Sequence, residues 1–184
     1  AGDFNLQSGT AFVPERPFSL IFEKSGNQNF TLLASRAVFL EIVVKGNSSV
    51  NVTGTAGSLL EVGSASGGGL TVDSGGKFLL NRNNLLIAGR GSLNAGNQTG
   101  QVGFSKSDLH IVSSAGSHLN LYTVPAADSL RHLIVNLTGA GNLVVQNRLF
   151  VQDEVALVNG NANSNGNLNL VSTVTRTARV VAES

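Results

Sequence analysis

The stretch Leu133-Ile134-Val135-Asn136-Leu137 opens a series of short units that continues to Val171. Each unit places an aliphatic residue at every second position, and a β-strand directs such residues to one face. The later units are Leu143–Val145, Leu149–Val151, Val155–Leu157 and Leu168–Leu170. The alternation predicts an inward-facing row of Leu133, Val135, Leu137, Leu143, Val145, Leu149, Val151, Val155, Leu157, Leu168 and Leu170.

The segments between these units are rich in glycine, asparagine and other turn formers. They are Thr138–Asn142, Gln146–Arg148, Gln152–Glu154 and Asn159–Asn167. Strands this short cannot each bury a face alone, so the pattern predicts that each strand has other strands stacked above and below it. We therefore predict an all-β parallel β-helix, or β-solenoid. The same rhythm also occurs in antiparallel β-sandwiches and jelly rolls, which form the alternative.

Similar units extend back along the chain to Val50. They are Val50/Val52, Leu60/Val62, Leu70/Val72, Phe78/Leu80, Leu85/Ile87, Leu109/Ile111 and Leu119/Leu121. With turns of ~20 residues, residues 46–184 would supply about seven coils, stacked ~4.8 Å apart into a rod of roughly 34 Å. No stretch of useful length shows the spacing of an amphipathic helix, so helix content should be near zero.

Residues 1–45 differ from this body and form a separate predicted unit. Phe18–Lys24 and Val38–Lys45 are longer extended runs, and phenylalanines concentrate in this part of the chain. Pro14 and Pro17 favour an edge position for the first run. An exposed solenoid end invites uncontrolled stacking, so we predict that residues 1–45 cap residues 46–184. The alternative is that this segment donates a strand to the next subunit of a fibre.

The composition points away from several classes of protein. Of the 184 residues, 41% are hydrophobic and 12% charged, with 22 glycines and a net charge of +1. The charged fraction is about half the usual ~25%, as in many long-lived extracellular β-proteins. There is no cysteine for disulfides, and the longest apolar run is too short for a membrane helix. The absence of methionine predicts a processed or excised product. The near-neutral charge disfavours nucleic acid or membrane insertion.

Three segments carry a resemblance to a known class of repeat. They are Asn83–Asn97, Gly103–Leu121 and Leu130–Val180, the last ending in Thr177-Ala178-Arg179-Val180. Their pattern resembles the β-helical repeat segments of large secreted surface and adhesin-like proteins of Bacteroidetes-type bacteria. The resemblance covers about the last 100 residues. It implies a right-handed parallel β-helix, export to the cell surface and an adhesive or structural role, and it supplies no catalytic motif.

Carboxylates and histidines form no recognisable catalytic or metal-binding motif. Asp153 and Glu154 are adjacent, but neighbours along a strand should point to opposite faces. Asp73, Asp108 and Asp128 are scattered, and we expect them to be solvated. The histidines His110, His118 and His132 lack a ligand spacing, and strand parity places His110 and His132 outward. We therefore predict no catalytic, cofactor-binding or metal-binding residues.

Glycine and asparagine clusters fit turns better than ligand sites. Gly67–Gly69 and Gly75–Lys77 resemble phosphate-binding loops, but Phe78 stands where such a motif needs Ser or Thr. Asparagines alternate from Asn159 to Asn169 and could form an amide face, although Gly160 and Gly166 favour a turn-rich loop. With no tryptophan and Tyr122 as the single tyrosine, a dedicated sugar-binding platform is disfavoured.

The sequence therefore favours a non-enzymatic structural or adhesive module, extracellular or on the cell surface. Its expected partners are copies of itself, as in a filament or surface layer, other surface components, and glycans. One alternative is a carbohydrate-binding or carbohydrate-active β-helix, in which Asp153 or Glu154 would act on an acidic polysaccharide. The other is a pilin-like subunit that exchanges residues 1–24 between protomers.

Overall fold

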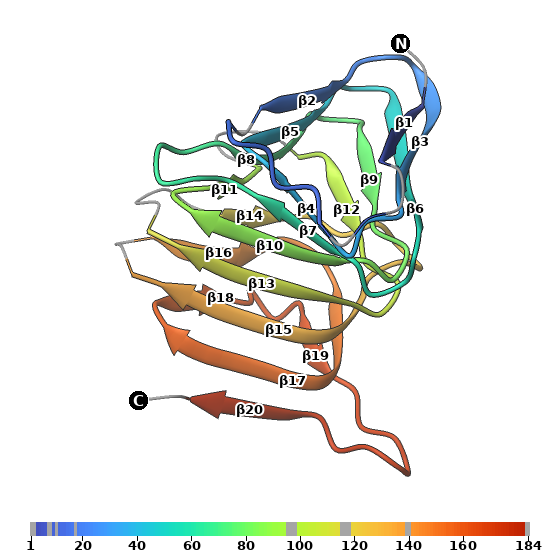
Figure 1. Cartoon of the computed structure of the whole chain (residues 1–184). Helices are drawn as coiled ribbons and strands as arrows, with labels where there is room; N and C mark the ends of the chain where they lie inside the picture. The colour runs from blue at the N-terminus through green and yellow to red at the C-terminus, as the bar shows by residue number, and fades with distance from the viewer. Residues whose placement is uncertain are drawn as a thin grey trace.

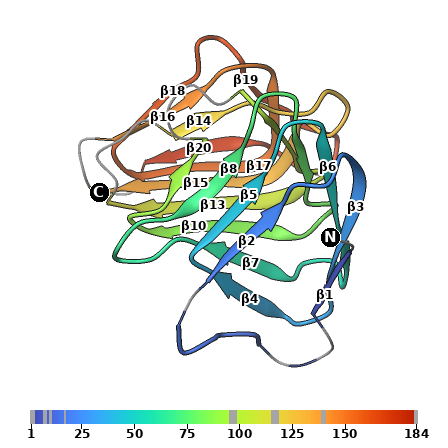
Figure 2. The same cartoon turned by 90° about the horizontal axis from the view of Figure 1, so that it is seen from above.

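The computed structural model of the chain describes residues 3–6, 9, 11–16, 18–94, 99–114, 119–138 and 141–182. In these ranges every regular element is a β-strand, and the strands form parallel sheets stacked as a β-solenoid of roughly seven turns (Figure 1). Seen from the N-terminal end, the chain runs clockwise as it recedes, so the β-helix is right-handed (Figure 2). The predicted parallel β-helix is confirmed, and the antiparallel alternative is wrong.

Three faces surround the core. The first is the sheet of β1 (Phe4–Leu6), β3 (Gly26–Leu32), β6 (Ser48–Gly54), β9 (Lys77–Leu79) and β12 (Gln101–Gly103). The second contains β4 (Arg36–Phe39), β7 (Leu59–Val62), β10 (Asn84–Gly89), β13 (Ser107–Ser113), β15 (Ser129–Leu137), β17 (Leu149–Asn159), β19 (Leu168–Leu170) and β20 (Arg179–Ala182). The third has two sheets, β2 (Ser19–Phe22), β5 (Glu41–Val44), β8 (Gly69–Val72) and β11 (Ser92–Leu93), then β14 (Leu119–Leu121), β16 (Asn142–Val145) and β18 (Asn161–Asn163).

Each coil is somewhat longer than the ~20 residues expected for such a turn. On the second face Leu60 pairs with Leu85, and Leu85 with Leu109, separations of 25 and then 24 residues. The extra residues lie in the turns at the corners. The alternation of aliphatic residues within the strands does not predict the length of these turns. The roughly seven turns consequently include strands from residues 1–45 as well as from the later part of the chain.

Stacked aliphatic side chains fill the interior. Residues at equivalent positions of successive coils lie over one another and are withdrawn from water, as in the fully buried column Leu60, Leu85, Leu109 and Leu133. Burial of such apolar surface is the main favourable contribution to folding. Of the predicted inward row, the nine residues from Leu133 to Leu157 are buried or packed against this core.

The segment predicted as a cap continues the same sheets. Strands β1 to β5 lie within residues 1–45, and β1 pairs with β3 of the same chain. Phenylalanine rings gather at this end of the core, where Phe30 and Phe39 are fully buried and Phe4 and Phe12 pack against them. These rings close the apolar interior at its N-terminal end. The division of the chain at residue 45 stays a prediction.

Two details differ from the predicted pattern. Leu170 lies in register with the buried Val151, as its predicted inward position requires, but it is 42% exposed because β19 lies in the last described coil and pairs with a strand on one side only, β17. Gln152–Glu154 do not interrupt the chain as a turn but lie within β17. There the pairing of β17 with β15 shifts register between Leu130 and His132, so these residues form a bulge in a continuous strand.

Candidate functional site: a basic groove along one corner

Similar turns recur where the chain passes from the first face to the second. Leu80–Asn83 and Phe104–Ser107 are tight turns on successive coils, each closed by a backbone hydrogen bond of 3.0 or 3.1 Å between its end residues. Both central residues of each turn have positive φ: 47° and 71° for Asn81 and Arg82, and 48° and 71° for Ser105 and Lys106. This geometry defines a type I′ turn. Arg82 and Lys106 therefore occupy the same turn position on adjacent coils.

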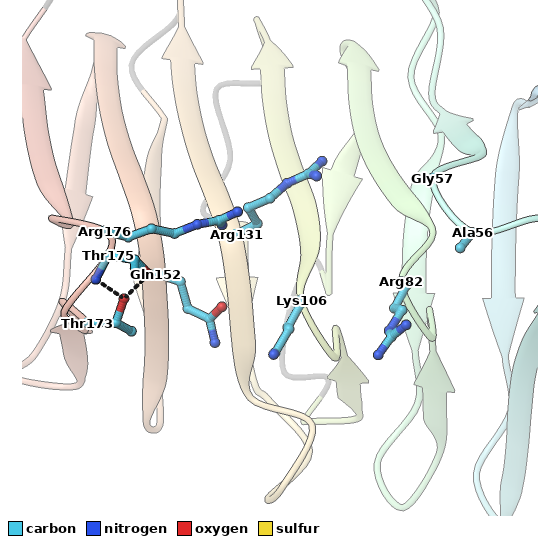
Figure 3. Close-up of a pocket in the computed structure, with 9 residues that line it drawn as sticks. All are labelled: Ala56, Gly57, Arg82, Lys106, Arg131, Gln152, Thr173, Thr175 and Arg176. Carbon is cyan, nitrogen blue, oxygen red and sulfur yellow. Dashed lines mark hydrogen bonds between the residues drawn. The ribbon is translucent and has the colours of Figure 1, made fainter.

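A groove of about 540 Å³ follows this corner. Four cations, Arg82, Lys106, Arg131 and Arg176, contribute to its lining, together with uncharged residues. None of the described lining residues is a carboxylate, and Figure 3 shows these residues spread along the axis over successive strands. The uncharged lining residues are Ala56, Gly57, Gln152, Thr173 and Thr175. The volume lies within the range of small-ligand sites.

Two of the four cations lack an acidic partner among the described residues. Arg131 binds Asp108 through Nε at 2.9 Å and also through Nη2. Arg176 binds Asp153 through Nη1 at 2.8 Å. Arg82 and Lys106 make no ion pair in the part of the chain that the structure describes. The uncompensated positive charge of the groove therefore lies on two adjacent coils, where like charges repel.

The described ion pairs follow one rule: the two partners lie on neighbouring coils. The pairs are Arg36–Glu61, Lys45–Asp73, Arg131–Asp108, Arg148–Asp128, Arg176–Asp153 and Arg179–Glu154. Asp108 and Asp128, expected to be solvated, are each only 7% exposed. Neither of these two expectations is met, because burial on the tightly stacked coils is compensated by an arginine.

Asp153 and Glu154 do not point to opposite faces. Both side chains lie outside the core, Asp153 beside Arg176 and Glu154 beside Arg179 at 2.6 Å. The bulge in β17 breaks the strict alternation of the strand, which is why the expectation is wrong. Both carboxylates are therefore neutralised by arginines of the following coil.

The outward histidines lie next to this network. His132 and His110 are both partly exposed on the outer side of the second face, as predicted, whereas His118 lies outside the described residues. His132 joins two coils, with Nδ1 2.8 Å from Asp108 and Nε2 3.8 Å from Asp153. No group of three His, Asp or Glu side chains able to hold a metal ion occurs among the described residues.

Burial and charge shift the pKa of two groups in this network. Burial raises the pKa of Asp108, but hydrogen bonds from Arg131 and His132 outweigh it and leave the pKa below its ordinary value. Burial lowers the pKa of His110 despite the opposing charge of Asp108, and the charge of His132 adds to the lowering. The fold therefore favours ionised Asp108 and neutral His110.

These shifts predict an acid-sensitive fold with two separate windows. Because the pKa of His110 is lower in the folded state, its contribution to stability is complete above the unfolded value of 6.5 and declines as pH falls below it. Asp108 affects stability at lower pH. Its contribution to stability is lost only as the pH falls below 3.8, the ordinary pKa of this carboxyl. We expect Tm to fall between pH 7 and 5, and to fall less in His110→Gln. Equal slopes for both proteins in that range would contradict this assignment.

The asparagine run is only partly extended. Asn161–Asn163 form β18, but Asn165 has a φ of +49° and lies in the turn that follows. The proposed amide face is thus broken after Asn163, in keeping with the turn-rich interpretation. The glycines of Gly67–Gly69 and Gly75 all have positive φ, which is typical of turns and tight coil contacts.

No sequence pattern predicted the basic groove. Arg82, Lys106 and Arg131 are isolated in the sequence and match no motif. A signal was present in the Asn81-Arg82 and Ser105-Lys106 pairs, each directly after a buried residue and 24 residues apart. That signal becomes meaningful only when the coil length is known.

The fold and groove define the chain as a parallel β-helix with a basic corner. No protein-family model matches the chain, and neither the curated proteins nor the solved structures compared with it include a match. The described part of the chain also contains no helix with the length and hydropathy needed to span a lipid bilayer.

Proposed function

We propose that this chain is a non-enzymatic structural and adhesive module of an exported cell-surface protein. The observation that carries the proposal is the coil-to-coil bonding: parallel ladders join successive coils on the three faces, and ion pairs join neighbouring coils. A body held in this way keeps its shape without a ligand. The proposed location at the cell surface is supported by the resemblance of the repeats to those of secreted surface proteins and by the low fraction of charged residues.

The arrangement of carboxylates argues against glycoside hydrolysis. Most glycoside hydrolases use two carboxyl groups on either side of the scissile bond, one of them able to give a proton. Asp153 and Glu154 each bind an arginine, and the described residues that line the groove include no acid. The acids therefore serve the stacking of the coils.

The test is to incubate the purified chain with acidic polysaccharides and to measure cleavage products. We expect none, and we expect Asp153→Ala and Glu154→Ala to lower stability by only about 0–1 kcal/mol each, as for exposed ion pairs. Cleavage by the unmodified chain that disappears in either variant would overturn the proposal in favour of a carbohydrate-active enzyme.

A self-assembling form of this role is supported by the two ends of the described solenoid. Ile21 is 51% exposed near the N-terminal end, and Val180 is 57% exposed on β20 in the last described coil. Strand edges that carry apolar side chains favour pairing with another chain. We expect sedimentation velocity to show concentration-dependent association that Val180→Asp weakens, with Val112→Asp as an exposed mid-solenoid control. A chain that stays monomeric at high concentration would exclude the filament.

A further inference from the structure

We propose that the basic groove binds an acidic linear polysaccharide of uronate sugars, with its chain parallel to the solenoid axis. Arg82 and Lys106 would anchor successive carboxylates, and the neighbouring polar side chains would contact sugar hydroxyls. This inference is independent of the structural role proposed above, because the coils are held together without these two side chains.

The first step is the electrostatic arrangement. Only 12% of the residues are charged, yet the described lining of this one groove contains four cations and no acid. Arg82 and Lys106 hold the same turn position on adjacent coils and lack an ion-pair partner among the described residues. An anion placed between them would relieve their repulsion and accept charge-assisted hydrogen bonds.

The second step is the spacing of the groove residues along the axis. In chain order, successive coils contribute Arg82, Lys106, Arg131, Gln152 and Arg176, and stacked strands lie ~4.8 Å apart. The groove thus offers about one polar side chain per coil. In Figure 3, Arg82, Lys106 and Gln152 form a row across the strands, and the side chains of Arg131 and Arg176 lie displaced from this row along the strand direction. A polyuronate carries one carboxylate on each sugar ring, so its charges form a similarly open row.

The third step separates this ligand from nucleic acid. Duplex DNA carries one charge per ~1.7 Å of its axis, much denser than one group per coil. Single strands are held by aromatic rings that stack on bases, and the groove has no aromatic residue among its described lining. Gln152, Thr173 and Thr175 instead offer amide and hydroxyl groups to a polyhydroxylated chain.

The paired arginines complete the site. Arg131 uses Nε and Nη2 for Asp108, and Arg176 uses Nη1 for Asp153, which fixes each guanidinium on the groove wall. A guanidinium carries five N–H donors, so both keep donors for a ligand. Their net charge is largely cancelled by the aspartates, and for that reason the main loss of affinity is expected from Arg82 and Lys106.

The experiment is calorimetric titration of the full chain with an oligogalacturonate, compared with the same oligomer reduced to neutral sugars and with single-stranded DNA. The test variant is Arg82→Gln/Lys106→Gln. The matched control is Lys24→Gln/Lys77→Gln, which removes two exposed lysines that likewise lack an ion pair among the described residues. Both variants lower the net charge by the same amount and change no buried side chain.

We expect salt-sensitive binding of the acidic oligomer, at least about tenfold weaker in the test variant, since two charge-assisted contacts are lost. The control should bind like the unmodified chain, and the neutral oligomer should bind poorly. No binding of the acidic oligomer, equal losses in both variants, or equally tight binding of single-stranded DNA would each overturn the proposal. Cleavage of the oligomer would concern the non-enzymatic role and not this one.

Discussion

Phe39→Ala is expected to destabilise the N-terminal coils by about 3–5 kcal/mol, the usual loss for a buried phenylalanine. The Phe39 ring is fully buried and lies within 5.4 to 6.2 Å, centroid to centroid, of the rings of Phe4, Phe12, Phe18 and Phe30. Removing it leaves a cavity between residues of several coils that cannot all move inward. Denaturant unfolding followed by far-UV circular dichroism measures the change.

The location of the damage is part of this prediction. In a solenoid each coil contacts only its neighbours, so a local defect need not unfold the whole stack. Hydrogen exchange should become faster in β3 and β4 while β13 and β15 keep their protection. The matched control is Phe150→Ala, because Phe150 is partly exposed outside the core. Its ring centroid lies 5.0 Å from Cζ of Arg148. Equal losses for the two variants would show that the phenylalanine cluster does not hold the N-terminal end.

Alternation of side chains made the core predictable. Leu133, Val135 and Leu137 are buried as expected, because period two leaves one choice of inner face for a strand with one apolar side. The prediction failed at one corner, where a bulge breaks the parity of residues 152–154. In the last described coil the register holds, but residues such as Leu170 are exposed because no described strand covers them.

The candidate site was not predictable in the same way. Whether Arg82 lies beside Lys106, or Arg131 beside Asp108, depends on the number of residues in each coil. That number varies with the turns, as the separations of 25 and 24 residues on the second face show. A difference of one residue would move a side chain to another position on the corner, so local patterns cannot assign these neighbours.

Gly69→Ala is the second change with a large expected effect, because the backbones of two coils approach closely at this glycine. Its φ is +123°, and an added Cβ would lie 2.1 Å from the carbonyl oxygen of Ser92 on the next coil. Gly67 is the matched control, since its φ is +124° and a Cβ there meets nothing within 4 Å.

Both variants carry the cost of an unfavourable backbone conformation, about 1–3 kcal/mol. Only Gly69→Ala adds a clash with the backbone, which costs about 1–3 kcal/mol more because β8 and β11 must separate. We therefore expect Gly69→Ala to lower the free energy of unfolding further than Gly67→Ala in the same denaturant titration. If the two variants lose the same stability, β8 and β11 are not stacked as closely as the structure places them.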